Sequence, residues 1–210
     1  MTAPTATIGG MASRTPYPEA ARELLRQTLF DAARDNLEKR PWSEVTMADI
    51  AAAAGVSRQT LYNEFGNRSE FAVALTIHEG ERFLGAVEDA VRAHTDDPRA
   101  AIHAALELFL RTAGEDPLIR MLLSDDGSGG MLPFVTTQGM PVVVWATTRL
   151  SAVIEEGWPQ APKADVKLLS ESLVRLAISY ITNPSETPDS TATSTAELLG
   201  PFIDRALGTA

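Results

Sequence analysis

A short segment near the N-terminus groups side chains that can form paired hydrogen bonds with planar partners. The segment is "AGVSRQTLYNEFGNR", residues 54–68, and its polar side chains include Arg58, Gln59, Thr60 and Asn63. Arginine pairs with the acceptor atoms of guanine, and glutamine or asparagine pairs with adenine, each pair contributing about 1–3 kcal/mol of discrimination. These residue types therefore favour recognition of nucleobase edges in a DNA groove.

The sequence gives less support for catalysis or metal binding than for nucleobase recognition. The histidines, His78, His94 and His103, do not share a helical face at ligand spacing, and the absence of cysteine excludes disulfides and thiolate metal sites. His103 and Glu107 are four residues apart, which permits the start of a metal site or a simple pair on a helix surface. We expect no enzyme activity, no metal and no cofactor. A four-helix-bundle oxidoreductase using His103 and carboxylates is an alternative, and it predicts a bound metal.

The apolar residues around the segment determine which side chains can face outward. One apolar set consists of Ile50, Ala51, Ala54, Val56, Leu61 and Phe65. Leu61 and Phe65 are four residues apart, so both lie on one helix face and can pack against the preceding helix. With that face buried, the polar side chains must point largely outward. Gly55 suits the turn between the two helices, and the pattern is that of a helix-turn-helix, whose second helix enters the major groove.

Capping residues mark where the helices of this region begin. Thr46 with Asp49 and Asn67 with Glu70 match the spacing of a capping box. Ser57 is a suitable N-cap for the helix between them. Three capped starts so close together predict short helices joined by tight turns.

The rest of the chain keeps the apolar spacing of helices, and no run with a period of two predicts a strand. We therefore predict an all-α protein with about nine helices. Residues 1–17 are predicted to form a flexible arm, and residues 18–66 a helix-turn-helix domain of three helices. Residues 67–210 would form a helical bundle for effector binding and dimerisation, entered through a connecting helix at about 67–92.

Three segments of this second part have a distinctive local composition. "DPLIRMLLS", residues 116–124, is predicted to be a short helix, and the following "SDDGSGGMLP" is predicted to be a loop because of its glycines and aspartates. "NPSETPDSTAT", residues 183–193, is predicted to be a linker that ends where the last helix begins.

Charge and hydropathy limit the partners and the compartment. The formal net charge is −10, but residues 1–78 hold 8 Lys+Arg against 9 Asp+Glu, whereas residues 79–210 hold 10 against 19. The acidity therefore lies almost entirely in the second part, and phosphate contacts would depend on a few locally placed groups. No secretory signal is visible, and the most apolar run, residues 140–146, is too short to cross a bilayer. We expect a cytoplasmic protein with no membrane contact.

The segment at residues 46–71 resembles the DNA-binding motif of the TetR family of transcriptional regulators. The resemblance rests on Ile50, Ala51, Ala54, Gly55, Val56, Ser57, Thr60, Leu61, Tyr62, Phe65 and the basic Arg68. Outside the segment it extends to chain length and helix count only. The resemblance implies a homodimer that binds double-stranded DNA and holds a small-molecule effector in its C-terminal domain.

The resemblance also implies a role for each polar residue of the motif. Base reading falls to the residues at the start of the second motif helix, Arg58, Gln59, Thr60 and Asn63. Phosphate contacts fall to Thr46, Tyr62 and Arg68, the last helped by the dipole of its own helix. Glu64 stands where the family often has His or Tyr, and its carboxylate would either turn toward Arg68 or accept a hydrogen bond from a cytosine amine. Arg68 replaces the usual lysine and keeps the charge.

Soft or bulky apolar residues in the second half can either pack in a core or line a cavity between helices. The resemblance implies an effector pocket, and its candidate apolar residues are Phe109, Met121 and Trp145. A polar anchor is expected from Thr147, Thr148 or Arg149. We expect a mainly apolar effector of fatty-acyl or alkane type.

The last two helices carry long apolar stripes that either close the monomer or pair with the same stripes of a second chain. The resemblance implies the second arrangement, with an interface made by Leu169, Leu173, Leu176, Tyr180, Leu199, Phe202 and Ile203. Such a dimer would place two reading helices about 34–36 Å apart on successive major grooves, so its operator would be palindromic.

These observations predict a ligand-responsive, sequence-specific regulator, which we expect to be a repressor released from its operator by the effector. The alternative is a helical small-molecule carrier or co-regulator whose DNA-binding head is degenerate. The near-neutral N-terminal part and Glu64 are the two features that favour the alternative.

Overall fold

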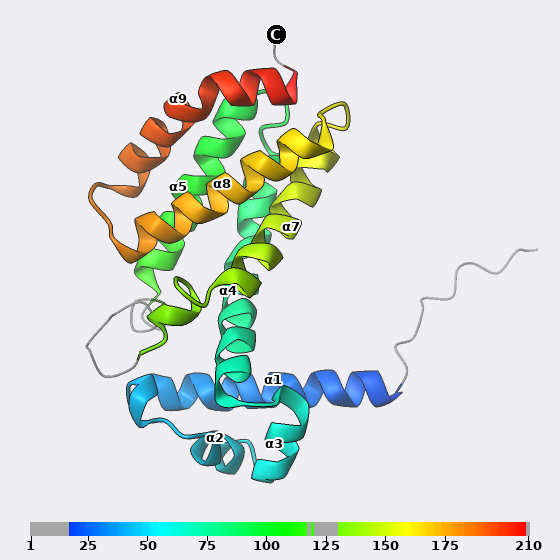
Figure 1. Ribbon diagram of the computed structural model, residues 1–210, viewed down its shortest axis with the longest axis vertical. Coiled ribbons are helices and arrows are strands. Elements are labelled where there is room, and N and C mark those ends of the chain that lie inside the picture. Colours follow the sequence, from blue (N-terminus) through cyan, green and yellow to red (C-terminus); the bar gives the residue numbers. More distant parts are fainter. Residues whose placement is uncertain (1–16, 117–118, 120–129, 209–210) are drawn as a thin grey trace, which may run out of the picture.

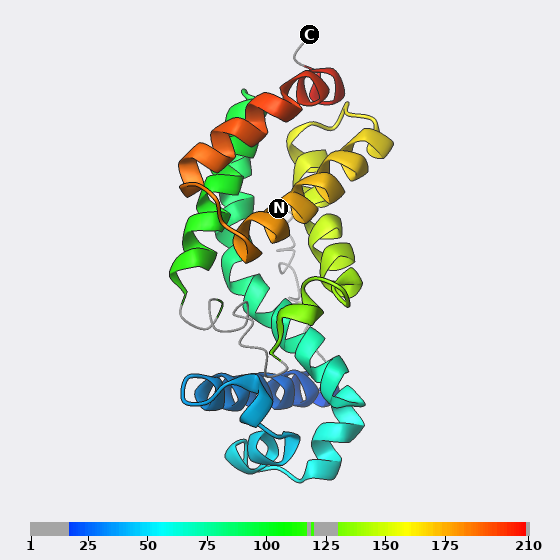
Figure 2. The same cartoon turned by 60° about the vertical axis from the view of Figure 1, so that its left-hand side comes forward.

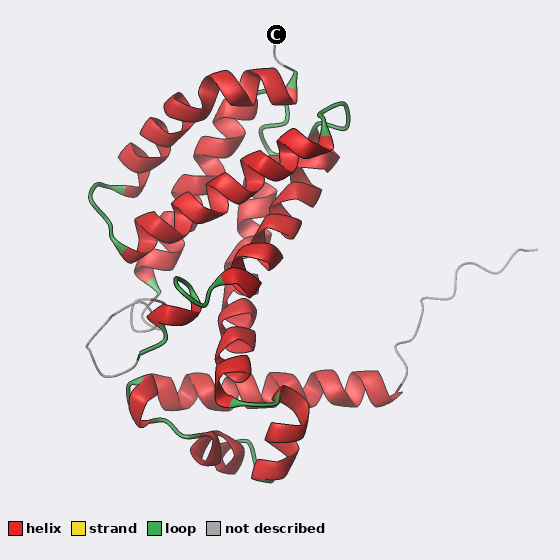
Figure 3. Cartoon of the chain, viewed as in Figure 1, coloured by secondary structure: helices red, strands yellow, loops and turns green. Residues whose placement is uncertain are grey.

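The computed structural model describes residues 17–116, 119 and 130–208, and every regular element in this part of the chain is a helix (Figure 3). The elements are α1 (Tyr17–Leu37), η1 (Trp42–Glu44), α2 (Met47–Ala53), α3 (Arg58–Phe65), α4 (Arg68–Arg92), α5 (Pro98–Glu115), η2 (Leu132–Phe134), α7 (Met140–Gly157), α8 (Lys163–Thr182) and α9 (Pro188–Leu207). The predicted all-α fold is confirmed, with eight α-helices among the described residues. Nearly all of the predicted arm and most of the helix predicted at 116–124 lie outside them.

Helix α4 joins two groups of helices (Figure 1). Residues 17–66, which hold α1 to α3, lie around its N-terminal end, and we call them the head. Residues 93–208 hold α5 to α9, and we call them the body. Figure 2 shows both groups from a second direction, with α4 running from one to the other. Its position makes α4 a mechanical connection between head and body.

The head is held together by a cluster of buried aromatic and aliphatic side chains. The ring of Phe65 on α3 lies 5.3 Å from that of Phe30 on α1 and 4.9 Å from that of Phe71 on α4, measured between ring centroids. Met131 and Phe134, from the segment around η2, pack into the same cluster. The head core is therefore completed by side chains from α4 and from the body.

The body is a helical bundle in which α5 packs against α4 and α9, and α7 packs against α8. Ile102, Ile154, Leu169 and Ile203 are among the side chains that are almost completely buried between these helices. Burial of apolar surface at about 25 cal/mol per Å² is the main favourable contribution to such packing.

The start of the last helix differs from the expectation. Residues 183–193 were expected to be a linker, but α9 begins at Pro188. The hydroxyl of Thr187 accepts a hydrogen bond from the amide of Ser190 at 3.3 Å, and proline is well suited to the first turn of a helix. The cap and the proline together start the helix within a segment whose composition alone is typical of a linker.

No helix in the described part of the chain is long and apolar enough to cross a membrane.

Candidate DNA-binding surface and ligand cavity

The two helices of the predicted helix-turn-helix meet at a tight corner. Gly55 adopts a left-handed conformation with φ +69°, which costs glycine little, and the amide of Val56 donates to the carbonyl of Ala51 at 2.9 Å. Ser57 then caps α3 by accepting a hydrogen bond from the amide of Thr60 at 3.0 Å. Because the corner is closed by local hydrogen bonds, the start of α3 has a defined direction relative to α2.

Helix α3 is anchored to the head by two side chains of its inner face. Leu61 is fully buried and Phe65 is 7% exposed, as expected from their spacing. The outer face exposes Arg58, Gln59 and Asn63. This display is the one that base reading in a major groove requires.

Two of the base-reading candidates are already engaged in hydrogen bonds. The side-chain amide of Gln59 donates to the amide oxygen of Asn63 at 2.7 Å, so the two side chains form a pair along the helix. The hydroxyl of Thr60 is half-buried and lies 2.8 Å from that of Ser57, within the N-cap. Thr60 is therefore held by the cap, whereas the Gln59–Asn63 pair is exposed for a partner.

Of the phosphate candidates, Tyr62 lies on α3, and Thr46 and Arg68 lie before and after it in the chain. Thr46 is exposed and forms the predicted capping box with Asp49, whose carboxylate accepts from the Thr46 amide at 2.9 Å. Tyr62 is 36% exposed. The guanidinium of Arg68 lies 4.4 Å above the ring centroid of Trp42 and donates to the Trp42 carbonyl. This contact fixes Arg68 beside η1 at the N-terminal end of α4, where helix amides favour anions.

Glu64 takes neither of its two expected orientations. Its side chain is 9% exposed and turns toward α1, where it accepts hydrogen bonds from Arg22 Nε at 2.8 and 2.9 Å and from Arg26 Nη1 at 2.9 Å. Arg26 also lies 4.7 Å from the ring centroid of Phe65. The carboxylate is thus neutralised by two arginines, and it does not place a free negative charge on the outer face of α3.

The two arginines also change the acidity of Glu64. Burial raises the pKa of this carboxyl group, but hydrogen bonds and charges from Arg22 and Arg26 outweigh burial and hold the pKa below its ordinary value of 4.5. A group whose pKa is lowered by folding stabilises the folded state above its unfolded pKa, and the contribution is lost as the pH falls through the folded pKa.

Replacing this carboxylate should therefore have a pH-dependent effect on stability. We expect Glu64→Gln to lower the melting temperature at pH 7, and we expect the difference from the wild type to shrink as the pH is lowered below about 4.5. Thermal unfolding measured by circular dichroism across this range tests the expectation. Glu44→Gln, at an exposed acid of the head, is the control and should change the melting temperature little at any pH. A difference for Glu64→Gln that stays constant with pH would contradict the ion-pair assignment.

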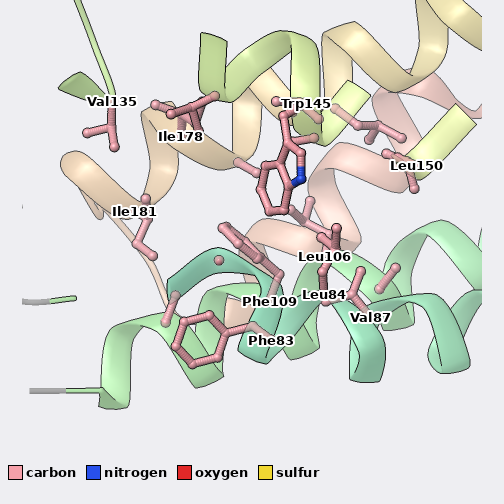
Figure 4. Close-up of a pocket in the computed structure, with 18 of the residues that line it drawn as sticks. Phe83, Leu84, Val87, Leu106, Phe109, Val135, Trp145, Leu150, Ile178 and Ile181 are labelled. Carbon is pink, nitrogen blue, oxygen red and sulfur yellow. The ribbon is translucent and has the colours of Figure 1, made fainter. Parts of the chain in front are cut away.

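A cavity of about 170 Å³ lies between α4 and the body helices α5, α7 and α8 (Figure 4). Phe83, Leu106, Phe109, Trp145 and Ile178 are among the side chains that converge on it from these four helices. With the exception of a threonine on α4, all of its lining residues are apolar. Cavities lined by hydrocarbon groups stay dry and accept apolar molecules, so the arrangement suits a ligand held by hydrophobic contact.

Only some of the five residues predicted to bind the effector line the cavity. Phe109 and Trp145 line the cavity, and Met121 lies outside the described residues. Thr148 and Arg149 do not line it, which corrects the expectation of a polar anchor there. The Thr148 hydroxyl donates to a main-chain carbonyl on its own helix, and Arg149 is paired with Glu88 on α4. Thr148 and Arg149 follow Trp145 by three and four residues, but their side chains turn to these partners and not into the cavity.

Thr147, the third expected anchor, is buried at 7% exposure but does not line the cavity either. His103, the candidate metal ligand, has Nε2 at 3.1 Å from the Thr193 hydroxyl and 3.5 Å from Asp189, both on α9. Glu107, which was expected to pair with it, instead accepts a hydrogen bond from Arg111. His103 is therefore part of an α5–α9 contact.

The residues predicted to form a dimer interface fall into two classes. Leu169, Leu173 and Ile203 are buried in the core of the chain itself, so their assignment to an interface is wrong. The other four, Leu176, Tyr180, Leu199 and Phe202, are partly exposed. On the same two helices, Leu168 and Leu198, which belong to the same apolar stripes, are 56% and 74% exposed. The spacing identified helices with apolar stripes but not which side of each helix faces outward.

Sequence reasoning also missed an acid inside the junction between head and body. Glu79 on α4 is 2% exposed and is bound by Arg34 of α1 and Arg82 of α4. A signal was present, because Glu79 lies four residues after Leu75 and four before Phe83, on a stripe of buried apolar side chains. A charged residue on such a stripe indicates a buried charge that needs a partner.

Comparison with known families and proteins agrees with this architecture. The N-terminal model of the bacterial regulatory proteins of the tetR family matches residues 29–75, and the C-terminal domain model of the bacterial tetracyclin repressor matches residues 97–201. The HTH-type transcriptional regulator AlkX of Mycobacterium tuberculosis is 35% identical over 205 residues, which cover 98% of this chain and 97% of that protein. The regulator EthR of Mycolicibacterium smegmatis is 30% identical over 89 residues, which cover 42% of this chain and 41% of that protein.

A solved structure is similar over most of the chain as well. The TetR family repressor AlkX from Dietzia sp. strain DQ12-45-1b superimposes with a TM-score of 0.74 at 37% sequence identity, covering 87% of this chain and 96% of that chain. The likeness includes both the head and the body. With its exposed recognition helix and its helical body, this chain belongs to the TetR family of helix-turn-helix transcriptional regulators, which are DNA-binding proteins and not enzymes.

Proposed function

We propose that this protein is a dimeric repressor that leaves a palindromic operator when a mainly apolar molecule occupies the cavity of the body. The observation that carries the proposal is the cavity, because hydrocarbon side chains from four helices line it and it lies against the helix that leads to the head. The exposed outer face of α3 provides the surface for DNA binding, which the proposal also requires.

On DNA, we assign base reading to Arg58, Gln59 and Asn63 of α3. Thr60 contributes mainly through the cap that orients the helix, since its hydroxyl already lies against Ser57. Thr46, Tyr62 and Arg68 are assigned to phosphates on either side of the groove, and such contacts position the head without reading sequence.

The chemistry of the cavity supports an effector of fatty-acyl or alkane type. A ligand that enters a dry apolar cavity gains chiefly from burial of its own apolar surface, and the lining offers a polar ligand almost no hydrogen-bond partner. The Dietzia repressor, which is similar over the whole fold, is described as implicated in biodegradation of n-alkanes. A straight hydrocarbon chain therefore fits the apolar lining of the cavity and agrees with the similarity to the Dietzia repressor.

The route from cavity to head runs through shared side chains. Met131 lines the cavity and is also a buried member of the head core, and Ile119 lines the cavity and packs against that core. A molecule that displaces these side chains changes the packing of the head on the body. By linkage, an effector that weakens DNA binding must itself be bound more weakly by the DNA complex, and by the same factor.

The proposal is tested by selecting DNA from a random-sequence library with the purified protein and then adding ligands to the complex. We expect the selected DNA to contain an inverted repeat whose half-sites are about one helical turn apart. In gel shifts at moderate salt, dodecanoic acid or dodecane should release the DNA, whereas resorcinol and glucose should not. Selection of no preferred sequence would contradict the regulator assignment, and release by the polar compounds alone would contradict the effector class.

Filling the cavity should block the response to the effector. Ala146 lies on the cavity side of α7, so in Ala146→Phe the added ring would occupy space that the ligand needs. We expect this variant to bind dodecanoic acid about tenfold more weakly, as measured by tryptophan fluorescence, while its affinity for the selected DNA stays close to that of the wild type. Val144→Phe is the matched control, since Val144 is 56% exposed on the outer side of the same helix. Equal ligand affinity in both variants would show that the ligand binds elsewhere.

A further inference from the structure

Glu79 is a buried carboxylate of α4 that is bound by one arginine of α1 and one arginine of its own helix. Its side chain is 3% exposed and accepts hydrogen bonds from Arg34 Nη1 and, at 3.1 Å, from Arg82 Nη1. Arg34 also places Nη2 at 3.5 Å from the carboxylate of Asp116, directly after α5. One guanidinium of the head is therefore bound to the connecting helix and to the body at the same time.

The ion pairs of Arg34 are directional, unlike the apolar contacts around them, and a second directional contact between the head and α4 is the hydrogen bond from Arg68 to the Trp42 carbonyl. The ring of Phe30 stacks on that of His78 with centroids 4.4 Å apart, and the surrounding contacts are apolar. Apolar packing is non-directional, so it tolerates small rotations of one surface on another. A guanidinium between two carboxylates has a fixed planar geometry, and its hydrogen bonds weaken quickly when the angle changes.

Burial makes this ion pair sensitive to disruption. Exposed ion pairs contribute little to stability, and many on this surface are of that kind. A buried carboxylate that loses one of its partners retains the cost of desolvation without full compensation. Any movement of α1 that separates Arg34 from Glu79 therefore has a penalty, and the head has one preferred orientation on α4.

We propose that Arg34 and Glu79 are positioning residues that fix the angle of the DNA-binding head relative to the body, and that occupancy of the cavity changes DNA binding by disturbing this ion pair. The first part of the proposal is independent of the operator and effector proposed above. The second part rests on them.

The position of Glu79 on α4 connects the ion pair to the cavity. Thr76 and Phe83, three residues before and four after it, both line the cavity and are its neighbours on the same side of the helix. Gly80 also lines the cavity, and a Cβ atom there would lie 2.9 Å from Cη2 of Trp145. The indole thus lies directly against the main chain of α4, one residue from the buried carboxylate. A ligand that moves Trp145 or Phe83 acts on the turn that carries Glu79.

Two arginine variants distinguish a role in positioning the head from a role in protein stability alone. Arg34→Met and Arg82→Met each remove one guanidinium from Glu79, but only Arg34 crosses from the head to α4. Because the chain has no cysteine, Glu44→Cys in the head and Glu197→Cys on α9 give a unique pair of exposed labelling sites. Labelled chains diluted with unlabelled protein report the distance between head and body by single-molecule energy transfer.

We expect one narrow distance distribution for the wild type and for Arg82→Met, and a broad one for Arg34→Met. Arg34→Lys, which keeps the charge, should restore most of the narrow population. The double variant Arg34→Met/Glu79→Met removes the buried carboxylate together with its partner from the head, so the head stays folded. Its distance distribution should also be broad. A narrow, wild-type distribution in the double variant would overturn the proposal, whatever the stability of the single variants.

DNA spacing provides a second readout that a purely structural role would not change. The wild type should bind its selected inverted repeat about tenfold better than the same repeat with one base pair inserted at its centre. In Arg34→Met this ratio should fall below about threefold while the base preference within each half-site is kept, and in Arg82→Met the ratio should stay near the wild-type value. An unchanged ratio in Arg34→Met would overturn the proposal. Failure of the wild type to select any repeat would instead contradict the proposed operator, and the distance measurement would still decide the role of Arg34.

Discussion

A chain carrying Leu198→Glu is expected to be a monomer in sedimentation velocity and to bind the selected operator about 100-fold more weakly than the wild type. Leu198 lies on α9 and is 74% exposed, and Leu168 on the adjacent α8 is 56% exposed. In the dimer proposed above, we place these two exposed apolar side chains in the surface that a second copy of the chain covers. A glutamate at the centre of such a surface would be buried without a partner, which is costly.

The loss of DNA affinity follows from the loss of the second head. Two linked heads bind two half-sites with an avidity that exceeds the affinity of one head by about 10²–10⁴. A monomer retains only the contacts of a single α3, so it should bind a half-site and the full operator about equally well.

Leu24→Glu is the matched control for the oligomeric state. Leu24 is a leucine of α1 that is 69% exposed, and the same substitution there adds the same charge to the head. We expect this variant to sediment as a dimer. If Leu198→Glu also sediments as a dimer and keeps full operator affinity, the interface does not include the exposed side of α9.

The second large effect is expected at the exposed amide pair of α3. Gln59→Ala should reduce the preference for one base at one position of each half-site by about tenfold, because a bidentate amide contact with adenine contributes about 1–3 kcal/mol of discrimination. Binding competitions against operators that carry each of the four bases at every position measure this change. An unchanged base preference would show that Gln59 does not read a base.

The contact between Gln59 and Asn63 leads to an expectation for variants of both residues. Since their side chains are joined by a hydrogen bond of 2.7 Å, removing either one frees the other to take a new orientation. We therefore expect the effects of Gln59→Ala and Asn63→Ala to be non-additive in the double variant.

Tyr62→Phe is the control for sequence-independent contact. Tyr62 is exposed beside this pair, and its hydroxyl is assigned to a phosphate. Loss of the hydroxyl should weaken binding to all operator variants by a similar factor and leave their order unchanged. A change in the order for Tyr62→Phe would assign this side chain to base reading instead.

Both capping boxes, the left-handed Gly55 and the burial of Leu61 and Phe65 could be predicted because each depends on residues at most four positions apart or on one residue type. Such local interactions are set by backbone geometry and helix periodicity alone. The exposed face of α3 then follows, since burial of one side of a helix leaves the opposite side free.

Contacts between residues far apart in the chain were the ones that could not be predicted. Glu64 was expected to interact with Arg68 or with a base, but its partners are Arg22 and Arg26, 42 and 38 positions earlier. On a helix with apolar residues on several sides, periodicity also does not tell which side a neighbouring helix covers. For this reason Leu169, Leu173 and Ile203 were assigned to an interface although they are core residues.

The sequence by itself determined an all-helical chain with a DNA-reading helix near its N-terminus, because capping, turn conformation and helix periodicity are properties of neighbouring residues. Only the tertiary structure decided where the cavity lies, which leucines of α8 and α9 remain exposed, and that Arg34 meets Glu79, 45 positions away. These features arise from the packing of helices that are distant in sequence. Burial is decided by such packing, and burial determines whether a side chain lines a pocket, forms an interface or holds a charge.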